Sequence, residues 1–149
     1  MKPKILFILH LPPPIHGAAM MGKYIQESEL VNSSFDCFCI NLATAGSLSD
    51  IGHISLKKLL KYFFLLKHIS HVVREIRPEL VYITPNAGGK AFFKDFIVVQ
   101  MLKSMGCKVI AHYHNKGVSV YQSKWVYNFF YKRFFSNLKV ILLAETLYK

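Results

Sequence analysis

The sequence alternates short apolar runs with longer segments whose apolar residues have helical spacing, and this alternation constrains the fold most. The runs have four to seven residues, and runs with so few polar positions are typical of strands covered on both faces. We therefore expect an α/β fold in which a parallel sheet has helices on both faces. The expected strands are Lys4–Leu9, Phe35–Asn41, Leu80–Thr84, Cys107–His112 and Val140–Leu143.

Ordinary start and stop signals bound the helical segments. Ser55 suits the N-cap of a long helix that ends before Pro78, and Gly106 suits the end of a later helix. The expected helices are Gly17–Leu30, 56–76, Phe92–Met105 and Val120–Phe135, with another that begins near Ala144–Tyr148.

The length of 149 residues predicts a single domain, and 52% hydrophobic residues are enough for a core. Because the last helix is cut after one turn, we expect residues 1–149 to be one domain of a longer chain. Cys37, Cys39 and Cys107 have neither a disulfide pattern nor zinc spacing, so we expect reduced core thiols in a cytosolic protein. No apolar run reaches 18 residues, which predicts that the chain does not span a membrane.

The formal net charge is +11, a large excess when only 18% of residues are charged. Such a basic surface indicates an anionic partner, which is a nucleic acid, a phosphate-bearing substrate or an anionic membrane. Composition alone does not choose among the three.

Ligands of parallel α/β folds bind at the carboxyl ends of the strands, so the first loop is a candidate site. His16, Gly17 and Ala18 lie where a helix begins, and small residues there let an anionic or polar ligand approach the helix amides. The loop has neither a dinucleotide-binding nor a Walker pattern. The alternative is a proline-stiffened turn with a glycine at the start of the helix.

A second candidate follows the fourth strand, where His112 and His114 share a face and Asn115 comes next. Three interpretations stay open: metal ligation, structural histidines that bind loop carbonyls, and hydrogen bonding to a polyol or phosphate substrate. Asn86 and Asp95 form a third candidate after the third strand. Asp95 is either an acceptor for a substrate hydroxyl or a first-turn charge that complements a helix dipole.

Two predicted helices are both basic and aromatic. Lys57, Lys61 and His68 share one face of the long helix, and Val120–Phe135 has eight aromatic residues. The second helix also contributes Trp125, Lys132 and Arg133 to a possible contact with an anionic bilayer. Core packing beside a solvated basic face is an equally good interpretation.

Four segments taken in order resemble the N-terminal half of GT-B glycosyltransferases of family 4. They are Pro12–Ala18 before a helix, Tyr82–Thr84, Val109–Asn115 and Leu142–Glu145. The similarity covers essentially all 149 residues, which is half of such an enzyme. The resemblance implies two Rossmann-like domains, of which the N-terminal one mainly holds the acceptor and the C-terminal one the nucleotide-sugar.

The resemblance also assigns roles to residues. Gly17 and Ala18 are similar to the family's Gly-Gly loop, which approaches the donor phosphate and the reacting sugar, although alanine replaces the second glycine here. His114 is similar to the family's active-site histidine and is the candidate catalytic residue. We expect Gly17 and His114 to face a common cleft. The other candidates for substrate binding are His16, Asn86, Asp95, His112 and Asn115.

The implied function is a retaining transfer of sugar from a nucleotide-sugar to a glycan or lipid-linked acceptor, with no metal and no cofactor. The implied location is cytoplasmic, or peripheral at the inner face of the cell membrane. The family's donor-site Glu-x7-Glu signature belongs to the other half, so we expect these residues to fold but to transfer no sugar alone.

Two other classes remain as alternatives. A non-catalytic flavodoxin-like or response-regulator-like module would need an acidic cluster or a Ser/Thr-rich loop after the first strand, and this chain has prolines and histidines there. Nucleic-acid binding is suggested by the charge, but no RNA- or DNA-binding motif is present, so we expect no nucleic-acid partner.

Overall fold

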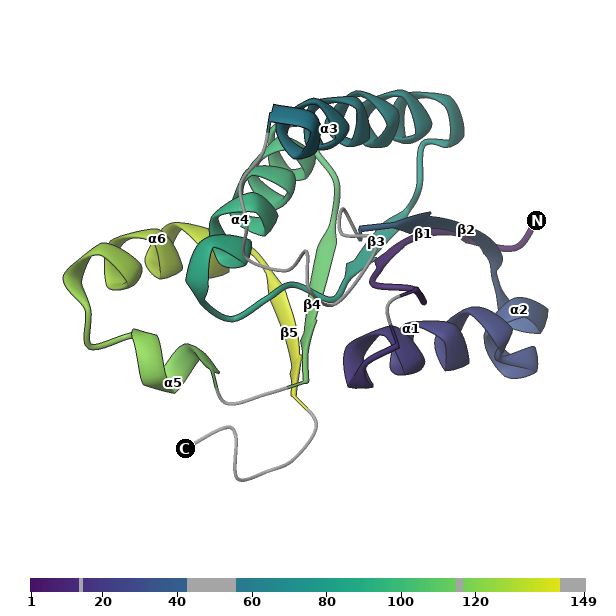
Figure 1. The fold of residues 1–149 in the computed structure, drawn as a ribbon. Coiled ribbons are helices and arrows are strands. Elements are labelled where there is room, and N and C mark those ends of the chain that lie inside the picture. The colour runs from purple at the N-terminus through teal and green to yellow at the C-terminus, as the bar shows by residue number, and fades with distance from the viewer. Residues whose placement is uncertain (14, 43–55, 115–116, 143–149) are drawn as a thin grey trace. The chain divides into compact units, whose positions relative to one another are not determined.

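Five parallel strands flanked by helices form one sheet, which confirms the predicted Rossmann-like α/β fold (Figure 1). The computed structural model describes residues 1–13, 15–42, 56–114 and 117–142. The strands are β1 (Lys4–Leu9), β2 (Asp36–Asn41), β3 (Leu80–Ile83), β4 (Val109–Tyr113) and β5 (Lys139–Leu142). Their order in the sheet is β2-β1-β3-β4-β5, so the direction of winding reverses between β1 and β3.

Six helices are described. They are α1 (Gly17–Glu27), α2 (Glu29–Ser34), α3 (Leu56–Ile76), α4 (Gly89–Ser104), α5 (Gly117–Tyr121) and α6 (Trp125–Phe135). α3 ends before Pro78 as predicted, whereas Ser55 and the helix expected near Ala144–Tyr148 lie outside the described residues. Gly106 follows the end of α4, as the sequence predicts, and has a φ of +77°, a conformation that favours glycine.

Two expected helices are each divided in the structure. In the segment 17–30, the first helix ends at Glu27. Ser28 then starts α2, because its hydroxyl accepts a hydrogen bond from the Val31 amide at 3.4 Å. The segment 120–135 is divided where the Lys124 amide donates to the Tyr121 carbonyl at 3.0 Å. This bond closes a turn between α5 and α6.

The fourth strand begins later than expected, at Val109 instead of Cys107. The Cys107 amide donates to the Leu102 carbonyl at 3.0 Å, and the Gly106 amide donates to Lys103 at 2.9 Å. These bonds satisfy the last carbonyls of α4, so Cys107 belongs to the end of the helix.

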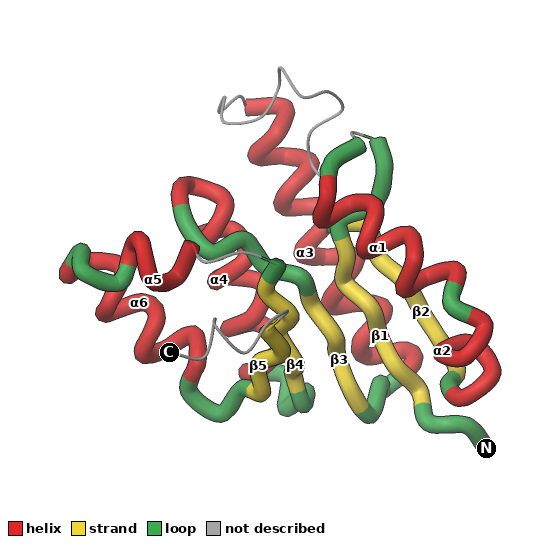
Figure 2. Tube along the Cα trace, turned by 90° about the horizontal axis from the view of Figure 1, so that it is seen from below, coloured by secondary structure: helices red, strands yellow, loops and turns green. Residues whose placement is uncertain are grey.

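The chain divides into two compact units, Met1–Tyr82 and Ile83–Lys149, and the boundary falls inside β3. The expectation of a single domain stays a prediction. In the first unit, β1 pairs with β2 from Lys4 opposite Asp36 to Leu9 opposite Asn41. α1 and α2 lie on one side of these strands (Figure 2) and α3 on the other.

The core on the α1 and α2 side of the first unit is built on alternate residues of β1. Ile5, Phe7 and Leu9 are buried, as period-two alternation requires of one strand face. The residues packed against them are Leu11, Ile25, Val31, Phe35, Cys37, Cys39, Leu80 and Tyr82. All three cysteines of the chain are free thiols and half-buried.

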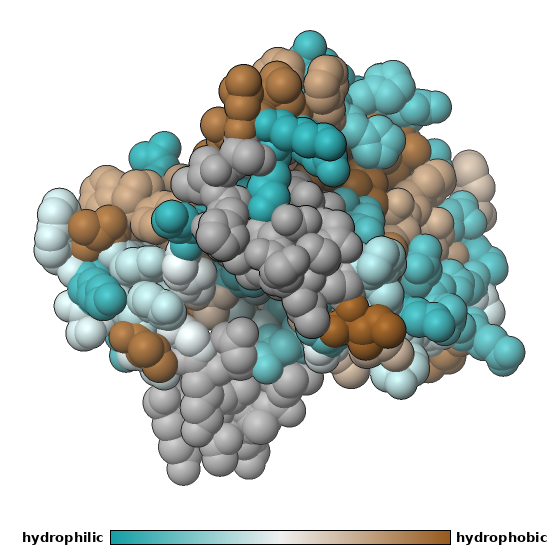
Figure 3. Space-filling model, viewed as in Figure 1, coloured by the Kyte–Doolittle hydropathy of each residue, from teal (hydrophilic) through white to brown (hydrophobic). Residues whose placement is uncertain are grey.

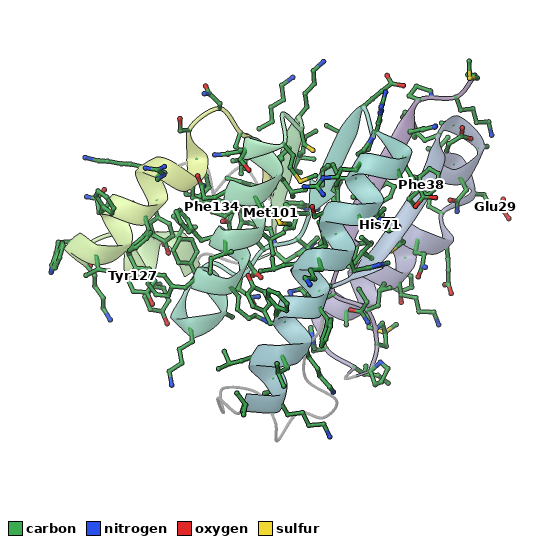
Figure 4. All side chains as sticks on the ribbon, turned by 90° about the horizontal axis from the view of Figure 1, so that it is seen from above. Glu29, Phe38, His71, Met101, Tyr127 and Phe134 are labelled. Atoms are coloured by element: carbon green, nitrogen blue, oxygen red, sulfur yellow. The ribbon has the colours of Figure 1, made fainter. Side chains whose placement is uncertain are left out.

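The core of the second unit is aromatic and lies between α4 and α6 (Figure 4). Phe92 is fully buried, with its ring centroid 4.8 Å from that of Tyr131 and 5.7 Å from that of Phe134. Phe96 and Phe130 meet edge to face at 5.0 Å. Most of the aromatic residues of α6 therefore serve packing, because α4 supplies a matching set of phenylalanines.

Candidate functional site

The first candidate loop joins β1 to α1 in the first unit. His16 is the N-cap of α1, and its Nδ1 accepts a hydrogen bond from the Ala19 amide at 3.3 Å. The imidazole of His10 lies beside it, with the ring centroids 6.1 Å apart. The Leu11 amide donates to Asn41 Oδ1 at 3.2 Å and ties the loop to the end of β2. The loop therefore presents imidazoles and the first amides of a helix.

Gly17 and Gly22 have different roles in α1. A Cβ added to Gly17 would meet nothing within 4 Å, and Gly17 is exposed, so its place at the start of the helix is open. A Cβ on Gly22 would lie 2.2 Å from the carbonyl oxygen of His10. Gly22 lets the helix approach the loop, and sequence reasoning missed it because a lone glycine inside a helical pattern has no distinctive signal. The amides of Gly17 and Ala18 belong to the first turn, where a helix has no acceptors of its own.

The second candidate lies at the end of β4 in the second unit. His112 and His114 lie together as predicted, with their ring centroids 4.3 Å apart. Burial lowers the pKa of His112, and the neighbouring His114 lowers it further. Burial also lowers the pKa of His114, whose ring nitrogens have no hydrogen-bond partner among the described residues. The pair is therefore neutral near pH 7 and suited to hydrogen bonding. Asn115 lies outside the described residues.

The third candidate follows β3, also in the second unit. The Asn86 backbone amide and its side-chain Nδ2 each donate to Asp95 Oδ2 at 2.7 Å. Asp95 is fully buried, so its carboxylate binds the loop instead of standing open to a ligand.

The alternative role of Asp95 as a first-turn charge is wrong. α4 begins at Gly89, three residues before the expected start, so Asp95 lies beyond its first turn. The sequence does not reveal this helix start, because Gly88, the N-cap of α4, makes no side-chain cap bond that a sequence pattern would show.

Burial raises the pKa of Asp95 from 3.8 to about 6, although the two bonds from Asn86 and the charge of Lys94 oppose this rise. Tyr113 lies close enough for the carboxylate to raise the pKa of its hydroxyl, in addition to the larger effect of burial. Neither Asp95 Oδ1 nor the Tyr113 hydroxyl has a hydrogen-bond partner in the described part of the chain.

Within residues 1–13, 15–42, 56–114 and 117–142, no three His, Cys, Asp or Glu side chains gather as metal ligands would. His16, Gly17 and Ala18 belong to the first unit, whereas Asn86, Asp95, His112 and His114 belong to the second. A common cleft for Gly17 and His114 therefore stays a prediction.

The residues proposed for membrane contact divide between α3 and α6. On α3, Lys57 and Lys61 are exposed beside a group of exposed apolar side chains (Figure 3), which we call the α3 apolar face. This face consists of Leu56, Leu59, Leu60, Phe63 and Phe64, between 51% and 74% exposed. On α6, Trp125 is 82% exposed and shares a helical face with the exposed Lys132 and Arg133.

Comparisons of the chain with protein-family models, with curated proteins and with solved structures gave no match. The resemblance to glycosyltransferases therefore remains an expectation based on the order of the four segments.

Proposed function

We propose that this chain is the acceptor-binding half of a retaining glycosyltransferase. The main support is the position of its hydrogen-bonding groups, which follow the carboxyl ends of parallel strands, where this class of fold binds ligands. In the first unit these are His16 and the first-turn amides of Gly17 and Ala18 after β1. In the second unit they are Asn86 after β3 and His112 and His114 at the end of β4.

The chemistry fits sugar transfer, because an oxocarbenium-like transition state depends on positioned electrostatics more than on a strong nucleophile. Retention of configuration is what the resemblance implies. On this proposal, the amides of Gly17 and Ala18 face the donor diphosphate. His114 holds a sugar hydroxyl, since a neutral imidazole both donates and accepts. The nucleotide base is bound by residues outside these 149.

The test is the His114→Ala variant of the full-length protein, assayed for turnover of a nucleotide-sugar. We expect turnover to fall by about 10² to 10³, the usual effect of removing one transition-state hydrogen bond. His71→Ala is the matched control, because His71 is an exposed histidine on α3. Unchanged turnover in His114→Ala would remove the role of this residue, and turnover by the 149 residues alone would refute the division into halves.

We further propose that the α3 apolar face binds an anionic membrane surface. Its five residues have the spacing i, i+3, i+4, i+7 and i+8, so they form one continuous stripe. Lys57 and Lys61 lie beside the stripe. Lys67 follows the stripe one turn further along the helix, and its Nζ lies 4.8 Å from the centroid of Phe63. α3 has no acidic residue before Glu75. A helix with an apolar stripe and lysines beside it is suited to the interface of a bilayer that contains anionic lipid.

None of the helices among the described residues is long and apolar enough to cross a bilayer. The proposed contact is therefore one in which α3 lies along the surface, with its leucines and phenylalanines in the acyl boundary and its lysines at the phosphates.

The membrane proposal is tested by sedimentation with vesicles of phosphatidylcholine, with and without 30% phosphatidylglycerol. We expect binding to the anionic vesicles and a loss of at least about tenfold in the double variant Leu59→Ser, Phe63→Ser, since each side chain contributes about 1.5–3 kcal/mol when buried. Leu30→Ser on α2 is the control, because Leu30 is 78% exposed outside the face. Equal binding by the double variant and the control would contradict the proposal.

A further inference from the structure

The loop from Pro85 to Gly88 is held by side chains from three helices of the second unit. Asp95 of α4 accepts both hydrogen bonds from Asn86. The Tyr131 hydroxyl of α6 donates to the Ala87 carbonyl. Tyr121 of α5 packs on Gly88 so closely that an added Cβ would lie 2.1 Å from the tyrosine ring. These contacts tether the loop to all three helices.

This loop lies in a position where ligands are expected. It follows β3, one of the two strands between which the order of the sheet reverses, and loops after such strands bind ligands in doubly wound folds. Pro85 and Ala87 are buried, whereas Asn86 is only half-buried and its amide is the polar side chain of the loop.

The charge of Asp95 has no structural necessity. An asparagine at residue 95 would offer a carbonyl oxygen to the same two donors without a buried negative charge. What the carboxylate adds is strength, because hydrogen bonds to an ionised acceptor are about twice as strong as neutral ones. It also polarises the Asn86 amide, and a polarised amide has a more strongly accepting carbonyl oxygen.

We propose that Asp95 is a positioning residue, which holds and polarises Asn86 so that the loop binds hydroxyl groups of the sugar acceptor. This inference rests on the proposed function. Asp95 itself touches no ligand and acts through Asn86. Among the described residues, the charge of Lys94 on the same helix acts on Asp95. The charge of Asp95 in turn acts on Tyr113 of β4, which Tyr131 also influences electrostatically.

The first measurement needs no ligand. The Asn86 backbone and side-chain amide protons are followed by NMR in the 149-residue chain between pH 5 and pH 8. We expect both to titrate with a midpoint near pH 6, the pKa to which burial raises Asp95. Asp95→Asn should abolish this titration, and Asp36→Asn, the same change at an exposed carboxylate, should leave it intact. If the chemical shifts of the Asn86 amide protons do not change with pH in the wild type, the proposal is overturned.

The second measurement is the affinity for a panel of methyl glycosides at pH 7.5 and pH 5, read from the same spectra. We expect about tenfold weaker binding at pH 5, the effect of exchanging a charged acceptor for a neutral one. The Asp95→Asn variant should bind the glycosides weakly at both pH values. The pH dependence of affinity that this variant retains measures the contribution of His112 and His114 to binding. Tyr131→Phe loosens the loop at Ala87 but should keep the dependence on pH.

The outcomes separate the two proposals. Failure of the wild type to bind any glycoside would overturn the proposed function and the ligand assigned here. Glycoside binding that is equal in the wild type and in Asp95→Asn at both pH values would overturn only the positioning role.

Discussion

Asp95 is held in a site that disfavours its charged form. Its pKa is about 6 in the folded chain against 3.8 for a free carboxyl, and this difference corresponds to about 3 kcal/mol. The folded state holds the proton of Asp95 more tightly than the unfolded state does. The contribution of Asp95 to the free energy of unfolding is therefore lost as the pH rises from about 4 through 6. The two hydrogen bonds from Asn86 lower the pKa of Asp95, but they offset only part of the increase that burial causes.

The stability consequence is measurable by urea unfolding at several pH values. The free energy of unfolding of the wild type, minus that of Asp95→Asn, should fall by up to about 3 kcal/mol between pH 4 and pH 7. Asp36→Asn, the same change at an exposed carboxylate, is unfolded alongside as the reference variant. A flat difference for Asp95→Asn would mean that the carboxyl titrates as it does in the unfolded chain.

The two glycines of α1 predict opposite effects of the same substitution. Gly22→Ala should destabilise the chain by about 1–3 kcal/mol, because its Cβ would meet the backbone carbonyl of His10, which cannot rotate away. Gly17→Ala has open space and should change stability by less than about 1 kcal/mol, in the stabilising direction. Urea unfolding of both variants under one condition tests this, and equal losses would contradict it.

At the level of elements, Lys103 of α4 caps the C-terminal end of α6. Its ammonium donates to the carbonyls of Arg133 at 3.2 Å, Phe134 at 2.6 Å and Ser136 at 2.5 Å. These carbonyls lie at the negative end of the helix dipole, so a cation there satisfies and stabilises them. Burial and the charge of Arg133 lower the pKa of Lys103.

Lys103→Met should therefore destabilise the chain by about 1–2 kcal/mol, because three carbonyls lose a donor while the apolar stem is kept. Lys108→Met is the control, since Lys108 is exposed. Thermal unfolding of the two variants side by side makes the comparison, and a loss in Lys108→Met as large as that in Lys103→Met would argue against the cap.

The elements also show what a sequence can predict here. All five strands were predicted to within two residues, because period and length separate buried strands from helices. The breaks at Ser28 and Lys124 were missed, since each depends on a local hydrogen bond inside a segment of helical composition. Helical spacing likewise did not reveal that Leu59 is exposed while Ile69 is buried, because exposure depends on which neighbouring elements pack against each turn.

At the level of the whole molecule, the net charge of +11 predicts binding that weakens with salt. Binding to anionic vesicles should fall between 50 mM and 500 mM salt but keep a residual part, because apolar contact is not screened by ions. Binding to an oligonucleotide would instead be lost almost completely, since it depends on released counterions. Parallel salt titrations with both probes test this, and a preference for the oligonucleotide would favour nucleic-acid binding.

The fold was predictable and the sites were predictable only in part. The alternation of strands and helices in the sequence was enough to predict the parallel sheet. Strand geometry also predicts that His112 and His114 point to the same face. The partnership of Asp95 with Asn86 was not predictable, because it depends on where α4 begins and on how deeply residue 95 is buried.

The α3 apolar face also has a practical consequence for handling the protein. Exposed leucines and phenylalanines on one helix promote self-association at high concentration when no lipid is present. A mild nonionic detergent should disperse such aggregates and improve recovery during purification. Without detergent, we expect crystals to favour lattices in which two copies of the chain shield the α3 apolar face from solvent.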